Sequence, residues 1–464
     1  MTPGEALELP LVQLGQALRG RKVTSAQLAQ EALERLEKRA RPLNAIAALL
    51  PDRALAEAKQ ADAELAAGKW RGPLHGVPFG AKDLVAAKGA PTTWGARWLK
   101  DRVIDQDAGV IERLRESGAV LVAKLSTVQL AGAFGYHRAD ASLFGPGKNP
   151  WDPARWAGGS SSGSAAAVAA RCVPFAIGSE TWGSILTPSA LCGLAGLRPT
   201  FGRVSRAGVM ALSYSLDKLG PLATRAEDAL IALAGMSGHD ENDPASVEGQ
   251  PKIVPGRQGH RLKIGALMPD AMKGDAEVIA AHKRHLAELS KLADVVPIES
   301  PSKLPVEEVA QLILRAEEAS AFEDFIDAGA LAGLASTDGQ ASALADRDLR
   351  ASDYVRAQRI RGLIRAELAR FFETHDAIVT PALGLLGAVA PKLEDDFDVF
   401  FDAPDPVGAI GNLLGLPSVA LPGPLVRGLP TALQLMGPAW SEETLVACAT
   451  QLELKTGFAA QKPG

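Results

Sequence analysis

The sequence predicts an α/β protein: one large domain in which a β-sheet is covered by helices on both faces. Three observations lead to this prediction. The chain has 464 residues, of which 47% are hydrophobic and 22% charged, so it can bury a large core. Short apolar runs bounded by glycine and proline alternate with segments of helical spacing along most of the chain. Finally, no long linker, internal repeat or acidic tract divides the sequence.

The N-terminal segment, residues 11–67, is expected to be helical. Its apolar residues recur at helical spacing, and Thr24-Ser25 precedes the run AQLAQEALERLEKRA in the position of a helix N-cap. From Gly72 onward, short apolar runs alternate with helical stretches; the run AVLVAK, for example, follows a helix expected over residues 108–117. Residues 72–225 are therefore expected to form the alternating part of the core.

Further buried strands are expected later in the chain, from the apolar runs VPFAIGS, LKIGALM, DAIVTPAL and PSVALPG. Several of these runs end in polar or glycine-rich loops, and in open α/β sheets ligands bind at such strand ends. Residues 270–370 are the most helical part of the chain and are expected to cover the site, whereas residues 371–452 return to the pattern of the core.

Charge and hydropathy exclude several classes of protein. The formal net charge is -5 at pH 7, so no broad basic surface for nucleic acid or an anionic membrane is expected. The N-terminus carries Glu5 and Glu8 and lacks the order of a signal peptide. The most apolar stretch, residues 165–177, contains Arg171 and Pro174 and is too short to span a bilayer. We therefore expect a cytoplasmic monomer or homodimer that acts on a small molecule and binds neither nucleic acid nor membrane.

The three cysteines, Cys172, Cys192 and Cys448, are widely spaced and include no CxxC pair. Neither a disulfide framework nor a thiolate metal site is indicated. We interpret the cysteines as small buried residues, and we expect no metal and no other cofactor.

A glycine-serine run, GGSSSGSAAAVAA at residues 158–170, leads directly into an alanine-rich helix. Serine and glycine are favoured at helix N-termini for structural reasons alone. A phosphate site at the helix N-terminus is a second interpretation, but no GxxxxGKS motif accompanies it. A third is a G-x-S-x-G nucleophile elbow with Ser161 as the nucleophile of a Ser-His enzyme of the α/β-hydrolase type. Its best histidine would be His375, next to Asp376.

A fourth interpretation joins this run to two other segments. Ser184 follows Gly183 in the turn-prone segment GSETWGSILTP, and Lys82 follows the apolar run in HGVPFGAKD. A buried lysine is costly unless it is paired or loses its proton, so Lys82 is a candidate base. A surface lysine beside Asp83 is the structural alternative. The residues by themselves leave both open.

Six segments in order closely resemble the amidase signature family. They are GPLHGVPFGAKD, FGPGKNPWDPARWAGGSSSGSAAAVAA, GSETWGSILTP, CGLAGLRPTFGRVSRAGV, SLDKLGPLATRAEDA and NLLGLPSVALPGP followed by GLPTALQLMGP. The resemblance extends from about residue 11 to about residue 452. It implies that the whole chain, 1–464, is one amidase signature domain with a central mixed β-sheet covered by helices on both faces and a catalytic core in residues 72–225.

Matched onto this chain, the family's Ser-Ser-Lys catalytic triad falls on Lys82, Ser160 and Ser184. The 24-residue interval between the two serines is the one that the family pattern requires, and it selects Ser160 over its serine neighbours. The resemblance also implies an oxyanion hole formed by the main-chain N–H groups of Thr181, Trp182, Gly183 and Ser184.

The implied mechanism begins with neutral Lys82, which takes a proton from Ser160 while Ser160 takes one from Ser184. Ser184 attacks the amide carbonyl, and water later releases the acyl group. Lysine has a reference pKa of about 10.4, so this role requires a lowered pKa. A carboxylate facing the amine would raise that pKa, and we therefore expect Asp83 to point away or to be held by other donors.

The chain departs from the commonest family pattern at four positions. Ser162, Glu180, Trp182 and Leu186 stand where glycine, aspartate, glycine and arginine are usual. Trp182 is interpreted either as a wall beside the nucleophile or as a core-filling side chain that faces away. The candidate substrate contacts are Ser161, Trp182, Tyr136 and Asp405.

The predicted activity is hydrolysis of a small-molecule carboxylic amide to the acid and ammonia or an amine. The alternative within the family is the glutamine-hydrolysing subunit of a tRNA-dependent amidotransferase. Asp405, seven residues before Asn412, falls where that subunit places the acid that holds the glutamine amino group. The middle region of the chain differs from that subunit's, and no partner arginine is evident in the sequence.

Overall fold

One mixed sheet organises the protein, as predicted. The computed structural model describes residues 1–252, 261–267 and 271–464. The strands of the sheet are β1 (Ile46–Leu49), β2 (Pro78–Lys82), β3 (Val120–Leu125), β6 (Phe175–Glu180), β7 (Ala195–Arg198), β8 (Lys218–Ala223), β9 (Lys263–Leu267), β10 (Lys273–Gly274), β11 (Asp294–Ile298), β12 (Ala377–Gly387), β13 (Ser418–Pro422) and β14 (Ala432–Met436). Within the described ranges they follow the order β1-β3-β2-β6-β8-β7-β13-β14-β12-β9-β11, and β10 pairs with β12. The strand β2 is parallel to β3 and β6, whereas β6 and β8 are antiparallel.

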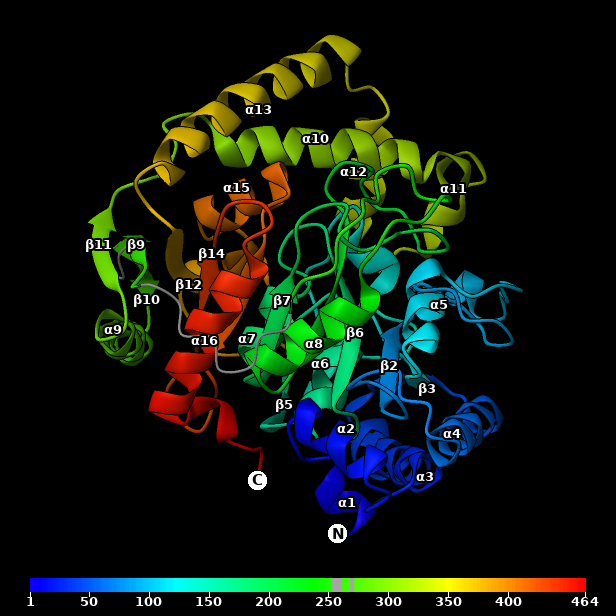
Figure 1. The fold of residues 1–464 in the computed structure, drawn as a ribbon. Helices are drawn as coiled ribbons and strands as arrows, with labels where there is room; N and C mark the ends of the chain where they lie inside the picture. The colour runs from blue at the N-terminus through cyan, green and yellow to red at the C-terminus, as the bar shows by residue number, and fades with distance from the viewer. Residues whose placement is uncertain (253–260, 268–270) are drawn as a thin grey trace.

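Helices cover both faces of this sheet (Figure 1). They are α1 (Pro3–Ala6), α2 (Leu11–Arg19), α3 (Ser25–Arg35), α4 (Pro51–Ala66), α5 (Gly109–Glu116), α6 (Ser162–Ala169), α7 (Leu186–Cys192), α8 (Ala226–Met236), α9 (Ala276–Ser290), α10 (Val306–Ala321), α11 (Glu323–Asp327), α12 (Thr337–Asp346), α13 (Ala351–Phe372), α14 (Asp398–Phe401), α15 (Pro406–Leu414) and α16 (Glu442–Thr456). The helices α8 and α16 pack together on one face, and α6 and α7 pack together on the other. A separate pair of short strands, β4 (Lys148–Asn149) and β5 (Asp152–Trp156), lies outside the main sheet.

The N-terminal segment is mostly helical, and its predicted N-cap is present. The hydroxyl of Thr24 accepts the N–H of Gln27, and the Gln27 side chain accepts the N–H of Thr24, so two N–H groups at the start of α3 are satisfied. The segment is not helical throughout, however. Strand β1 interrupts it and pairs antiparallel with β3 at the edge of the sheet, where a short apolar run gains main-chain hydrogen bonds.

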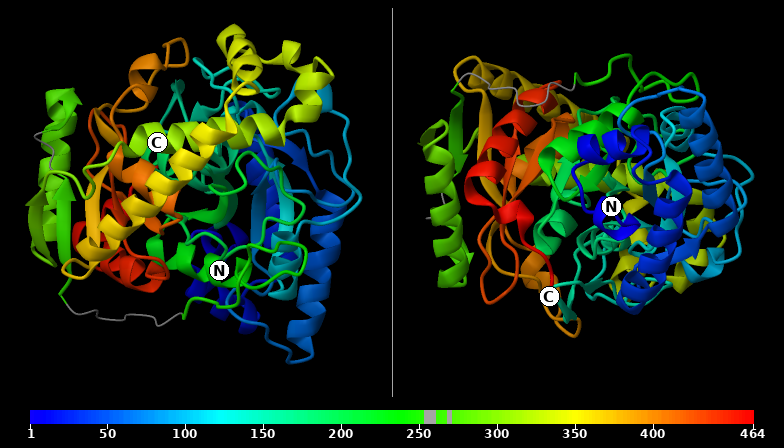
Figure 2. Two further views of the ribbon diagram at one scale, coloured as in Figure 1. Left: turned by 90° about the horizontal axis from the view of Figure 1, so that it is seen from above. Right: turned by 60° about the horizontal axis from the view of Figure 1, so that its bottom comes forward.

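The cover is formed by α10 to α13, and its two long helices, α10 and α13, lie over one end of the sheet (Figures 1 and 2). Its first helix, α10, begins at Val306, later than the predicted boundary at residue 270. Residue 270 itself lies outside the described residues. Part of the predicted cover belongs to the sheet instead: β11 pairs parallel with β9 in continuous register. The short run DVVPI, rich in β-branched residues, is a strand in a mostly helical stretch. Of the predicted run LKIGALM, β9 contains Lys263–Leu267, and Met268 lies outside the described residues.

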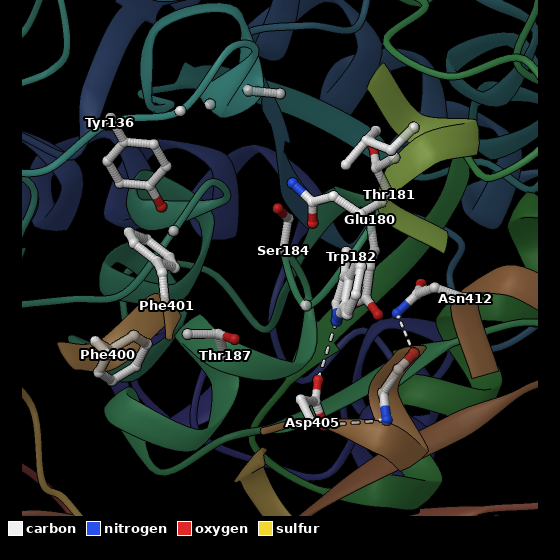
Figure 3. Close-up of a pocket in the computed structure, with 18 of the residues that line it drawn as sticks. Tyr136, Glu180, Thr181, Trp182, Ser184, Thr187, Phe400, Phe401, Asp405 and Asn412 are labelled. Atoms are coloured by element: carbon white, nitrogen blue, oxygen red, sulfur yellow. Dashed lines mark hydrogen bonds between the residues drawn. The ribbon is translucent and has the colours of Figure 1, made fainter. Parts of the chain in front are cut away.

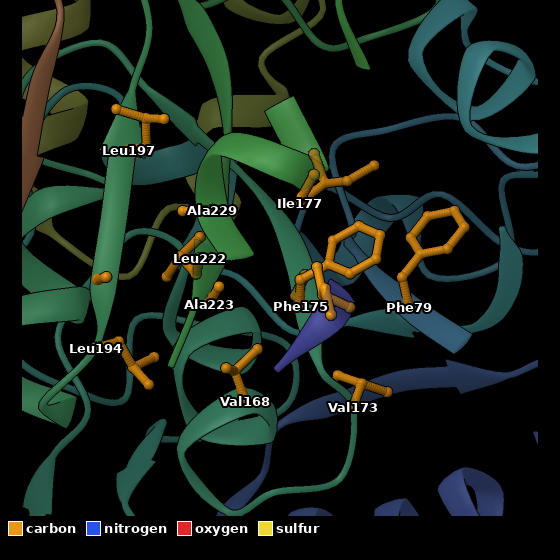
Figure 4. Close-up of a cluster of buried hydrophobic side chains, with 14 of the residues drawn as sticks. Phe79, Val168, Val173, Phe175, Ile177, Leu194, Leu197, Leu222, Ala223 and Ala229 are labelled. Carbon is orange, nitrogen blue, oxygen red and sulfur yellow. The ribbon is translucent and has the colours of Figure 1, made fainter. Parts of the chain in front are cut away.

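The main core lies between the sheet and α6 and α8 (Figure 4). Phe79 on β2 and Phe175 on β6 stack with ring centroids 5.4 Å apart. Helix α6 is buried along its whole length, and its alanines allow it to approach the strands closely. This packing fixes the relative positions of β2, β6 and α6, which carry the residues of the site.

Candidate active site

Three parallel strands end at one edge of the sheet, where the predicted site residues gather. Lys82 is the last residue of β2, and Ser179 and Glu180 end the neighbouring strand β6. Thr127 follows β3, the other parallel neighbour of β2. Because the carboxyl ends of parallel strands meet at the same edge, these polar groups lie close together.

Lys82 is completely buried and contacts Ser160, as the fourth interpretation of the sequence requires. Its Nζ lies 2.7 Å from the Ser160 Oγ and 2.9 Å from the Ser179 Oγ. Burial lowers the pKa of Lys82 to about 7, although the carboxylates of Asp217 and Glu180 oppose this shift. The amine is therefore partly neutral near neutral pH and can take a proton from Ser160.

Asp83 is held away from Lys82, which confirms the expectation for this carboxylate. One oxygen accepts the Lys124 Nζ at 2.8 Å, and the other accepts the N–H of Thr93 at 3.1 Å and its hydroxyl at 2.5 Å. Both Asp83 and Lys124 are fully buried, so Lys124 neutralises the carboxylate inside the protein. Lys82 thereby escapes the raised pKa that a facing aspartate would cause.

Ser160 lies in a loop that packs tightly against the end of β3. The Gly159–Ser160 peptide bond is cis, and the Ser160 carbonyl accepts the Thr127 hydroxyl at 3.0 Å and the Val128 N–H at 3.2 Å. Glycine is needed at position 163, because a Cβ there would lie 2.4 Å from the main-chain nitrogen of residue 126. The loop and the start of α6 are therefore held against the strand that neighbours Lys82.

Ser184 stands in a turn between β6 and α7. Glu180, at the start of the turn, accepts the N–H groups of Ile185 and Leu186 at 2.8 and 3.0 Å and pairs with the buried Arg198 at 2.8 Å. In the described part of the chain, the N–H groups of Gly183 and Ser184 have no acceptor. They are available to the oxygen of a substrate, as the implied oxyanion hole would require.

Ser161 occupies a different place from its neighbour Ser160. Its side chain is fully buried and does not line the pocket, and its hydroxyl donates to the main-chain carbonyl of Ser184 at 2.6 Å. His375 is not brought to it: that ring stacks on Phe371 and contacts the Phe371 carbonyl and the Thr374 hydroxyl. The structure thus does not form the Ser161–His375 pair of the elbow interpretation, and it gives Ser161 a structural contact instead of a substrate contact.

Replacing Ser161 by alanine tests this distinction. The Ser161→Ala variant removes a hydrogen bond to the Ser184 carbonyl but no atom of the proposed triad. We expect a loss of kcat of less than about tenfold, since one neutral hydrogen bond contributes about 1 kcal/mol. Steady-state kinetics on one amide substrate measures it. A complete loss of activity with intact folding would favour the elbow interpretation.

A pocket of about 880 Å³ opens beside Ser184 (Figure 3). Its lining includes Tyr136, Gly159, Thr181, Trp182, Gly183, Ser184, Asp405 and Asn412. Two polar atoms of its wall, Asn412 Oδ1 and Arg198 Nη2, are buried and have no hydrogen-bond partner among the described residues. Asn412 and Arg198 thus bring an amide and a guanidinium to the wall of the pocket.

Trp182 faces this pocket, which decides between the two interpretations of its role. Its indole N–H donates to Asp405 Oδ2 at 3.0 Å, and Asp405 Oδ1 accepts the Gly408 N–H at 3.0 Å (Figure 3). Burial raises the pKa of Asp405 to about 7, although the hydrogen bonds from Trp182 and Gly408 oppose this shift. Trp182 is thus a hydrogen-bonded wall of the pocket that Ser184 also lines.

Sequence reasoning did not foresee the contacts by which several polar residues hold the site. Ser179 contacts the Lys82 amine, Glu180 holds the turn through Arg198 and two N–H groups, and Asp217 accepts the Thr181 hydroxyl at 2.5 Å. A signal for Ser179 was present: it lies at the end of a buried strand whose neighbour ends in Lys82. No comparable signal linked Asp217 to Thr181, which are 36 residues apart.

Comparisons with known proteins show the family of the chain. The family model Amidase matches residues 27–446. Glutamyl-tRNA(Gln) amidotransferase subunits are 33% identical in Coxiella burnetii and 35% identical in Anaeromyxobacter dehalogenans, and each alignment covers 98% of both chains. The solved native peptide amidase of Stenotrophomonas maltophilia is 30% identical, covers 98% of both chains and superposes with a TM-score of 0.82. Among the described residues, no helix combines the length and the hydropathy that crossing a membrane requires. The chain therefore belongs to the amidase signature family, whose members hydrolyse carbon–nitrogen amide bonds.

Proposed function

We propose that the protein hydrolyses a carboxylic amide through an acyl-enzyme on Ser184, with Ser160 and Lys82 as the proton relay. The observation that carries this proposal is the buried contact between Lys82 Nζ and Ser160 Oγ at 2.7 Å, together with a pKa of about 7 for Lys82. A lysine that is neutral near operating pH can act as a general base. Ser184 lines the adjacent pocket, where a substrate carbonyl can reach it.

The reaction proceeds in two halves. Lys82 takes the proton of Ser160, Ser160 takes that of Ser184, and the Ser184 oxygen bonds to the amide carbon. The carbonyl oxygen becomes negatively charged and is stabilised by the main-chain N–H groups of Gly183 and Ser184. The relay returns its proton to the leaving nitrogen as the carbon–nitrogen bond breaks. Water then attacks the acyl group by the same relay and frees the acid.

For the amide itself, the first candidate is a small-molecule amide that the chain cleaves alone. The peptide amidase of Stenotrophomonas maltophilia, which matches nearly the whole chain, favours an enzyme of this kind. The pocket suits a substrate of that size, since typical small-molecule sites have volumes of about 300–1,000 Å³. Trp182 would then face the acyl part of the substrate.

Glutamine is the second candidate, and the relatives named as glutamyl-tRNA(Gln) amidotransferase subunits favour it. Asp405 lies in the pocket at the position that the resemblance assigns to the acid that holds the glutamine amino group. Here its carboxylate already accepts the Trp182 indole, so a bound ammonium would share or replace that hydrogen bond. Arg315 also lines the pocket, but it is paired with Asp346. In this role the chain would work with partner proteins that receive the ammonia.

Two measurements on the isolated chain test the proposal. Labelling with a fluorophosphonate probe, followed by mass mapping, is expected to modify Ser184. A panel of aliphatic, aryl and amino-acid amides, with glutamine included, is expected to release ammonia or amine from at least one simple amide without partner proteins. Label on Ser161, or no label from a preparation that cleaves amides, would contradict the acyl-enzyme. Cleavage of glutamine alone would favour the amidotransferase role.

A further inference from the structure

The turn that carries Ser184 is tied to a neighbouring loop by one carboxylate. The hydroxyl of Thr181, three residues before Ser184, donates to Asp217 Oδ1 at 2.5 Å. The other oxygen of Asp217 accepts the N–H groups of Leu212 and Ser213, at 2.7 and 2.9 Å. Asp217 stands directly before β8, so it joins the turn after β6 to the loop that leads into β8.

A second carboxylate joins that loop to the cover. Glu317 lies on α10, and its side chain accepts the Ser213 hydroxyl at 2.5 Å, the Ser215 N–H at 2.8 Å and the Ser215 hydroxyl at 2.7 Å. Tyr354 on α13 donates to the same carboxylate at 2.8 Å. A continuous hydrogen-bonded chain thus runs from the two long helices of the cover to Thr181.

Each of these two carboxyl groups is held by several hydrogen bonds. Asp217 and Glu317 each receive at least three hydrogen bonds from neutral donors, and hydrogen bonds to a carboxylate are shorter and stronger than those between neutral groups. A buried carboxylate that lost one of these donors would be less well satisfied, and the rest of its contacts would shift to compensate. The far end of the same turn is held separately, by Glu180 through the N–H groups of residues 185 and 186.

We propose that Asp217 and Glu317 are positioning residues for amide hydrolysis. Acting through Thr181, they hold the turn so that the Ser184 hydroxyl and the main-chain N–H groups of Gly183 and Ser184 face the substrate carbonyl together. This inference rests on the proposed function, in which Ser184 is the nucleophile. Its physical basis is that a misplacement of about 1 Å in a catalytic group costs roughly 100-fold in rate. The cover thereby contributes to catalysis through residues that do not touch the reacting atoms.

Substitutions of Thr181 test the link closest to the turn. Thr181→Val keeps the size of the side chain but removes the donor, whereas Thr181→Ser keeps the donor. We expect kcat to fall about 10- to 100-fold in the valine variant, with KM within about twofold of the wild-type value. The serine variant is expected to stay within about threefold of wild type, because its hydroxyl can still reach Asp217. Circular dichroism and Tm confirm that both variants are folded.

Glu317 provides a test at the far end of the hydrogen-bonded chain. Glu317→Gln removes the charge of the second carboxylate, and kcat is expected to fall about tenfold with KM little changed. If both residues act through the same turn, the double variant Thr181→Val/Glu317→Gln loses less than the product of the two single losses. The inference would be overturned if the kcat losses of the two single variants multiply in the double variant. It would also be overturned if Thr181→Val keeps the wild-type kcat, or if Thr181→Ser is as slow as Thr181→Val.

The outcomes separate this inference from the proposed function. If the proposed function fails, the wild-type chain itself shows no label on Ser184 with the fluorophosphonate probe. If only the positioning role fails, the wild-type chain is labelled and active, and the Thr181→Val variant is labelled at the wild-type rate. A positioning role predicts slower labelling in the valine variant, since the same turn presents the nucleophile to the probe.

Discussion

The Ser184→Ala variant is expected to lose amide hydrolysis almost completely. Removing the nucleophilic serine of a comparable catalytic unit lowers kcat by about a million-fold, since the positioned donors and the substrate site retain only residual catalysis. The turn is held by Glu180 and by the Asp217–Thr181 hydrogen bond, neither of which involves the Ser184 hydroxyl. The variant should therefore fold normally and still bind substrate.

Single-turnover kinetics measures the loss of hydrolysis, and a separate binding assay measures whether the variant still binds substrate. Ser161→Ala is the matched control, because it removes a neighbouring hydroxyl that is bonded to the Ser184 carbonyl. We expect Ser184→Ala to lose activity but to retain substrate binding. We expect Ser161→Ala to retain activity. Substantial turnover by Ser184→Ala would exclude the acyl-enzyme on this residue.

The second large effect concerns Lys82 and its pH dependence. Only the neutral amine can take a proton from Ser160, and burial lowers the pKa of Lys82 to about 7. Below that pKa the amine is protonated and cannot act as a base, so kcat/KM should fall about tenfold per pH unit as the pH decreases. Above it the amine is neutral, and the rate should level off.

The Lys82→Ala variant is expected to lose about 100- to 10,000-fold in kcat, which is the usual contribution of a general base. In this variant, the fall in rate below about pH 7 should disappear from the pH–rate profile, because no amine titrates at that position. Lys88→Ala is a suitable control, because Lys88 is close in the sequence but exposed, with Asp105 as its ion-pair partner. A Lys82→Ala variant with full activity at neutral pH, or with an unchanged acid limb, would contradict the relay.

Much of the candidate site could be proposed from the sequence because its residues come in ordered motifs that resemble those of one family. The glycine-serine run at the start of α6, the lysine at the end of β2 and the serine after Gly183 each occupy a position that local backbone geometry sets. The expectation for Asp83 was also correct, although the buried partner that holds it, Lys124, lies 41 residues away. Local patterns indicated the groups, but not the contacts that balance their charges.

Two expectations about secondary structure were wrong because contacts between residues that are distant in the sequence decide the outcome. Strand β1 within the predicted N-terminal helical segment and β11 within the predicted cover are short runs whose state is decided by pairing with distant strands. The orientation of Trp182 is likewise a tertiary property, because Asp405, which holds its indole, comes from 223 residues further along the chain.

The sequence by itself determined the fold class, because strand and helix patterning and glycine-rich turns are local consequences of side-chain size and backbone freedom. It indicated the triad candidates through the resemblance of six ordered segments to the amidase signature family. Only the tertiary structure decided that Lys82 is buried against Ser160 with a lowered pKa, that Ser161 is turned into the interior, and that two carboxylates tie the turn of Ser184 to the cover. Burial and the distances between charged groups depend on which strands and helices meet, and no local pattern specifies that.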